Sequence, residues 1–92
     1  MEEEKIITFL KDSGVNENSQ GFNYSVTLIK TILENPHYKI KNVITHIATK
    51  EMKPETTIKN HLRYAITLSN KYGGRLTIKD LVKLALQKNE RS

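Results

Sequence analysis

Apolar residues recur at helical spacing in five separate stretches of the chain. No stretch alternates apolar and polar residues in the way that is typical of a half-buried strand. We therefore expect an all-α fold, a compact five-helix domain that takes up the whole of residues 1–92. The expected helices cover residues 2–12, 22–33, 40–50, 54–72 and a last segment that begins at Thr77.

Residues that favour helix ends lie at several of these boundaries. Gly14 is expected to end the first helix, and Pro36 the second, because the residue before a proline is pushed out of the helical region. Pro54 suits the first position of the fourth helix, where its missing N–H would have no partner in any case. Thr77 is a good N-cap, with Asp80 three residues later as in a capping box.

The fourth helix divides its residues between two faces. At about 100° per residue, apolar side chains gather on one side, which we expect to be buried, and hydrogen-bonding side chains gather on the other. The buried side is expected to hold Ile58, Leu62, Ala65, Ile66, Ser69 and Tyr72, before Gly73-Gly74 ends the helix. The polar side holds Thr56, Asn60, Arg63, Thr67 and Lys71, flanked by Lys59 on one edge and by Thr57 and Tyr64 on the other. Side chains of these types can bond to bases and phosphates, and they can equally face water alone.

Charge is divided unevenly along the chain. Residues 1–38 contain three Lys or Arg and six Asp or Glu, a net charge of −3, whereas residues 39–92 contain twelve and four, a net charge of +8. A basic half that contains a helix pair is typical of proteins that approach a polyanion, although basic surfaces also occur on proteins that bind nothing anionic.

Other function classes have little support. The chain has no cysteine, so disulfides and cysteine-ligated zinc are excluded, and no two of His37, His46 and His61 have the spacing of a metal-binding pair on a helix. We expect no metal site, no cofactor and no small-molecule substrate, and the absence of a phosphate-binding loop or nucleophile elbow argues against an enzyme. The acidic start and the lack of a long apolar run argue against a signal peptide and a membrane span, so we expect a cytoplasmic protein.

The third and fourth helices have the apolar spacing of a helix-turn-helix over about residues 40–72. Ile44, Ile47 and Ala48 precede a short polar link, Thr49 to Lys53, and apolar residues resume at Ile58. The glycine often found in such a turn is absent, and Met52 lies near its place. Ordinary helical hairpins can have the same spacing.

Short sequence pieces at a particular spacing add to this pattern. They are Gly14-Val15, Gly21-Phe22 followed by Tyr24 and Ile29, Ile47-Ala48, and Arg63 followed by Ala65-Ile66. In these pieces the chain resembles, over about residues 6–75, the C-terminal DNA-binding effector domain of the stage-zero sporulation response regulators of spore-forming bacteria. The resemblance implies an all-helical regulator of transcription that places a recognition helix in the major groove and binds tandem DNA sites as a homodimer.

The resemblance also implies where DNA contacts would lie. The first half of the recognition helix would supply the base contacts Thr56, Thr57, Lys59, Asn60 and Arg63. The family's arginine, glutamate and arginine are replaced here by Thr57, Lys59 and Asn60, while Arg63 is kept, so the family's target sequence cannot be transferred. At the ends of the helix pair we expect the phosphate contacts Lys50, Lys53, Lys71 and Arg75.

Alternatives remain at this point. The acidic first half and the changed base-reading residues also fit a protein-interaction module that regulates a transcription or sporulation protein without reading DNA. RNA or another polyanion is a third possibility. The receiver domain that precedes the effector in these regulators is missing from residues 1–92, so the chain is either a stand-alone relative or a fragment.

Overall fold

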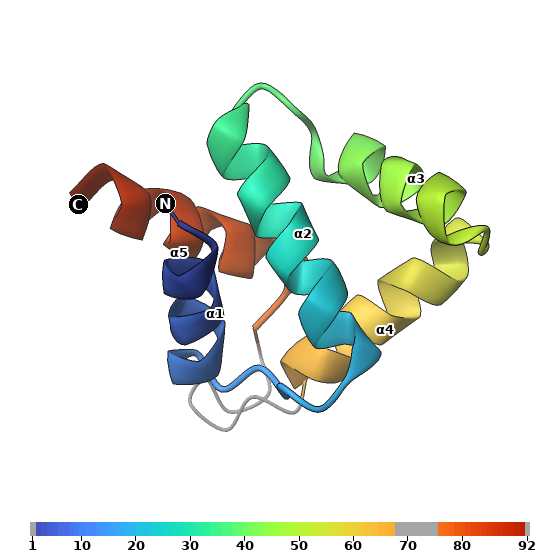
Figure 1. Cartoon of the computed structure of the whole chain (residues 1–92), viewed down its shortest axis with the longest axis horizontal. Helices are drawn as coiled ribbons and strands as arrows, with labels where there is room; N and C mark the ends of the chain where they lie inside the picture. Colours follow the sequence, from blue (N-terminus) through green and yellow to red (C-terminus); the bar gives the residue numbers. More distant parts are fainter. Residues whose placement is uncertain (1, 68–75, 92) are drawn as a thin grey trace.

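Five α-helices form the fold in the computed structural model, which describes residues 2–67 and 76–91 (Figure 1). They are α1 (Glu3–Asp12), α2 (Gln20–Glu34), α3 (Ile40–Glu51), α4 (Glu55–Thr67) and α5 (Ile78–Arg91). The described residues contain no strand, so the expected all-α fold with five helices is confirmed. None of these helices is both long and apolar enough to cross a membrane.

Helices α2 and α4 connect the two halves of the hydrophobic core. Helix α2 lies in the middle of the molecule, with α1 and α5 on one side and α3 on the other (Figure 1). One part of the core joins Phe22 and Val26 of α2 to the end of α4, to α1 and to α5. The other part joins Leu28 of α2 to Ile58 and Leu62 of α4 and to the apolar side of α3. Both parts include α2 and α4, so the packing of these two helices affects the whole core.

The two central helices approach each other closely at Gly21, near the start of α2. A Cβ atom at this position would lie 2.0 Å from the backbone oxygen of His61 and 2.8 Å from the Cβ atom of Ala65, both in α4. Only a residue without a side chain fits this space. The backbone N–H of Asn16, in the preceding loop, also donates to the carbonyl of Ala65 at 3.3 Å. Helix α4 is therefore held against the start of α2 by backbone contacts as well as by apolar packing.

Two helices end in the same hydrogen-bonding pattern with different residues at its left-handed position. After α1, Gly14 has a φ of 84°, and the N–H of Val15 donates to the carbonyl of Leu10. After α3, Met52 has a φ of 55°, and the N–H of Lys53 donates to the carbonyl of Ala48. In this pattern, N–H groups that follow the helix donate to the free carbonyls of its last turn, and the residue in the left-handed conformation is usually glycine. Gly14 ends α1 as predicted, whereas Met52 takes up this conformation despite its side chain.

Some helix boundaries differ from those predicted. Helix α2 begins two residues earlier, at Gln20, because the Ser19 hydroxyl accepts from the N–H of Phe22 and caps the helix. Helix α4 begins at Glu55, and Pro54 instead supplies the carbonyl that accepts from the N–H of Ile58. The predicted box at the start of α5 is confirmed by reciprocal hydrogen bonds between Thr77 and Asp80.

The length predicted for α4 can be compared only in part. The described part of α4 has 13 residues, fewer than the 15 of α2, so α4 is not the longest helix within the described residues. The predicted end of this helix, including Ser69, Tyr72 and Gly73-Gly74, lies outside them.

Candidate nucleic-acid interface

The rotation of α4 about its axis places its polar side outward. Ile58, Leu62, Ala65 and Ile66 are at most 1% exposed, as their spacing predicted. The opposite side consists of exposed residues, namely Thr56, Asn60, Arg63, Tyr64 and Thr67. The predicted accessibility of Asn60, Arg63 and Thr67 is therefore confirmed. Apolar burial on one side of a helix determines which residues face outward, because successive residues are about 100° apart.

The expected base-contact residues do not all have the same exposure. Thr56, Asn60 and Arg63 are exposed, whereas Thr57 and Lys59 are half-buried at the two edges of the outer face. Arg63 lies about 60° around the axis from Asn60, toward the same edge as Lys59. The centre of the face is thus occupied by Thr56, Asn60 and Thr67, and the positive side chains lie along one border.

Helices α3 and α4 are joined by a short connection that presents basic residues. Helix α3 continues through Glu51, so the link is Met52–Pro54 rather than the five residues expected. The expected phosphate contacts Lys50 and Lys53 are exposed at the end of α3 and in this link. Lys71 and Arg75, the other two, lie outside the described residues.

An acidic residue at the start of α4 is engaged by α3. Glu55 is in the first turn of α4, and its carboxylate accepts a hydrogen bond from the Thr45 hydroxyl of α3. A carboxylate here interacts favourably with the positive end of the helix dipole, but it would repel nearby phosphates. The bond to Thr45 ties Glu55 to α3 and joins the two helices near their connection.

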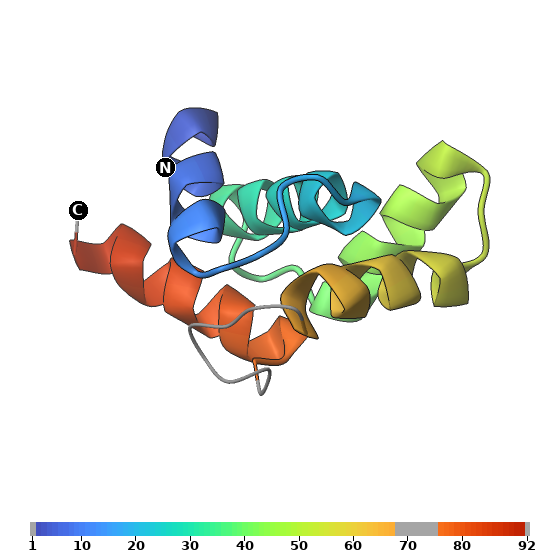
Figure 2. The same cartoon turned by 90° about the horizontal axis from the view of Figure 1, so that it is seen from below.

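The border of α4 that carries Arg63 faces the start of α5. Arg63, Ile66 and Thr67 of α4 line a pocket of about 390 Å³ together with residues 76–79, including Lys79. Figure 2 shows the end of α4 and the start of α5 beside each other at one edge of the molecule. The sequence pattern does not predict that Arg63 and Lys79 line the same pocket, because this depends on how α5 packs against the end of α4.

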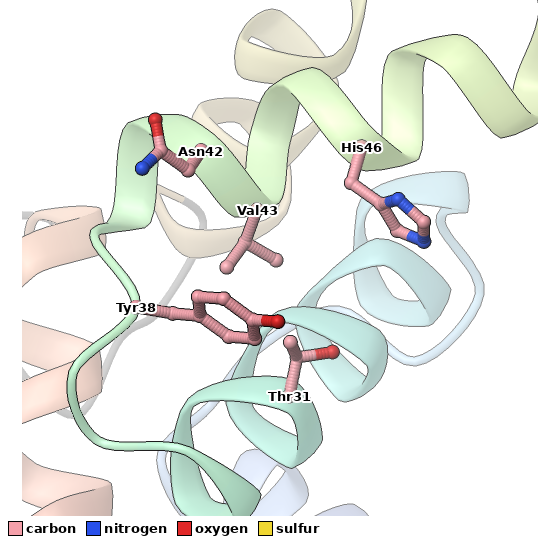
Figure 3. A pocket seen from close by; sticks show the side chains of 5 residues that line it. All are labelled: Thr31, Tyr38, Asn42, Val43 and His46. Atoms are coloured by element: carbon pink, nitrogen blue, oxygen red, sulfur yellow. The ribbon is translucent and has the colours of Figure 1, made fainter.

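A second pocket, of about 350 Å³, lies between α2 and α3. It is lined by Thr31, Tyr38, Asn42, Val43 and His46, and the Tyr38 ring faces Thr31 and Val43 (Figure 3). Neither Lys nor Arg is among its lining residues, and none of them belongs to α4. This pocket is therefore distinct from the polar face of α4 and does not have the charge that a phosphate would need.

The histidines have mainly a packing or surface position. His61 is half-buried, and its ring lies edge-on to Tyr24 with 5.9 Å between the ring centroids. His61 thus packs against α2 from the edge of the buried side of α4. Among residues 2–67 and 76–91, no group of three or more His, Asp or Glu side chains is arranged to hold a metal ion.

Comparisons with protein-family models, with curated proteins and with solved structures found no match to this chain. The resemblance to the sporulation effector domain thus rests on the sequence pieces alone.

Proposed function

We propose that this protein binds double-stranded DNA and regulates transcription, with α3 and α4 acting as a helix-turn-helix and the outer face of α4 entering the major groove. The observation that carries the proposal is the composition of that face. Thr56, Asn60 and Thr67 lie near its centre and are exposed, and none of them is acidic. Asparagine offers a donor and an acceptor that match the adenine edge in the major groove.

The surrounding charge supports the same proposal. Residues 40–67 contain five Lys or Arg and two Asp or Glu, a net charge of +3. Lys50 and Lys53 lie at the link between the helices, where they could reach phosphates on one side of the groove. Phosphate contacts of this kind supply most of the non-specific affinity for DNA.

The test is selection of bound sequences from a pool of random duplexes, followed by affinity measurements on the selected site and on each of its point-substituted forms. We expect Asn60→Ala to relax preference at one base pair, by about 1–3 kcal/mol, while affinity for random DNA stays nearly unchanged. Asn23→Ala is the matched control. Asn23 is exposed on α2, about 200° around that helix from Gly21, and so faces away from α4.

A protein-interaction role without DNA reading is the second candidate, and one observation favours it. Tyr64 is 61% exposed, one turn after Asn60 on the same side of α4, and Met52 is 91% exposed in the adjacent link. Exposed aromatic and methionine side chains are enriched where proteins bind one another. If the wild-type protein selects no sequence and its affinity for duplex DNA does not fall as salt rises, DNA binding is refuted and this candidate replaces it.

A further inference from the structure

Two positive side chains from different helices share one pocket at the border of the α4 face. Arg63 comes from α4 and Lys79 from the first turn of α5, and both line the hollow of about 390 Å³. Neither has an ion-pair partner among the described residues. The hydroxyl-bearing residues Thr67 and Thr77 also line it, and Ile66 and Ile78 supply apolar walls. An anion between these two side chains would attract both of them, and at short range this attraction outweighs their mutual repulsion.

We infer that this pocket binds one phosphate of the DNA backbone, held jointly by Arg63 and Lys79; the inference rests on the DNA binding proposed above. When a helix lies in the major groove, the backbone phosphates flank its edges rather than its centre. Arg63 lies on the edge of α4 that faces α5, so it and Lys79 would meet the strand on that side. Arginine can bind a phosphate through two parallel N–H groups, while lysine adds a compact charge.

The side chains, rather than the start of α5 itself, make this site. The N–H of Asp80 donates to the Thr77 hydroxyl at 3.1 Å, and the Asp80 carboxylate accepts from the N–H of Thr77 at 3.3 Å. These bonds already occupy groups at the start of α5. Attraction for a phosphate therefore has to come from Arg63 and Lys79, and it acts against the nearby charge of Asp80.

The inference gives Arg63 a different role from the base contact that the resemblance implies. A phosphate contact weakens binding to all sequences when it is lost, whereas a base contact changes the preference at one position. Asn60, at the centre of the face, keeps its base-reading role. The two possible roles of Arg63 can therefore be told apart by measuring the affinity of Arg63→Ala for the selected site and for random DNA.

The test combines protein variants with DNA in which one phosphate at a time is replaced by an uncharged methylphosphonate. We expect Arg63→Ala and Lys79→Ala each to lower affinity several-fold for selected and random duplexes alike, and the two changes together to flatten the salt dependence by about one unit. One methylphosphonate position should weaken the wild type, weaken each single variant less, and have no effect when Arg63 and Lys79 are both replaced by alanine. Lys83→Ala is the control, since Lys83 lies one turn further along α5 outside the pocket lining, and this variant should stay sensitive to that methylphosphonate.

The outcomes separate this inference from the proposed function. If the wild type shows no salt-dependent DNA binding, the proposed function fails. If the wild type binds and Asn60→Ala relaxes its preference, but Lys79→Ala keeps full affinity and methylphosphonate sensitivity, DNA binding stands and the shared phosphate site is refuted. If Arg63→Ala relaxes preference at a single base pair, Arg63 reads a base and the pocket assignment is overturned.

Discussion

Replacing Gly21 with alanine should destabilise the domain strongly for an exchange of such small size. The added Cβ atom would lie 2.0 Å from the backbone oxygen of His61 and 2.7 Å from its carbonyl carbon. Non-bonded carbon and oxygen atoms need well over 3 Å, so α2 and α4 would have to separate by more than an ångström. The obstacle is backbone inside a helix, which cannot rotate away as a side chain can.

The size of the effect follows from two opposing contributions. Alanine in place of glycine inside a helix favours the helix by about 1 kcal/mol. Overpacking a core costs about 1–3 kcal/mol, and more where backbone must move. Because α2 and α4 join both parts of the core, we expect a net loss of about 3 kcal/mol, which is a large share of the total stability of about 5–15 kcal/mol typical of native proteins.

Urea unfolding followed by far-ultraviolet circular dichroism measures this loss, and Asn23→Ala, at an exposed position in the same turn of α2, serves as a control for helix propensity. Asn23→Ala should change the free energy of unfolding by no more than about 0.7 kcal/mol, in the stabilising direction. Removing the Ala65 side chain as well should not rescue Gly21→Ala, because the nearest obstacle is the His61 backbone. A Gly21→Ala protein within about 0.5 kcal/mol of the wild type would show that α2 and α4 are not packed this closely.

Three further predictions concern other parts of the fold and the proposed interface. Leu62→Ala should lower the free energy of unfolding by about 2–5 kcal/mol, the range for truncating a fully buried leucine, and a loss below about 1 kcal/mol in chemical denaturation would contradict the burial of this side of α4. Met52→Gly should raise stability by about 0.5–1 kcal/mol, because a left-handed conformation costs a residue with a side chain about 1–2 kcal/mol and glycine gives back about 0.5–1 kcal/mol of this gain in chain entropy. Gly14→Ala should lower the melting temperature for the same reason. An unchanged melting temperature in both variants would argue against the φ angles at these helix ends. Lys50→Ala and Lys53→Ala should each weaken DNA binding about equally for all sequences and flatten the salt dependence by about one unit, and a loss confined to one preferred sequence would disprove their assignment to phosphates.

Interactions between residues close together in the sequence account for much of the fold. Apolar spacing was enough to predict five helices and the buried side of α4, because a side chain's direction in a helix follows from its position alone. Gly14 and Thr77 were likewise recognisable as helix-end residues, since their roles depend on hydrogen bonds within a few residues of each other.

Patterns of neighbouring residues predict the backbone less well where a segment can adopt two conformations. Nothing in the residue type of Met52 predicts a left-handed conformation, which the packing of α3 against α4 selects across a three-residue link. The start of α2 was misplaced by two residues because Ser19 and Asn16 are both suited to the beginning of a helix or to a turn.

The sequence by itself determined which residues of α4 face outward, and therefore which can take part in the proposed DNA contact, because a period of 3.6 residues separates the two sides of a helix. Only the tertiary structure decided that Gly21 lies against the His61 backbone and that Arg63 shares a pocket with Lys79. Gly21 and His61 are 40 positions apart in the chain, and Arg63 and Lys79 are 16 positions apart. Contacts at such separations depend on the angles and distances at which helices pack, and these arise from the fit of many side chains at once rather than from any local pattern.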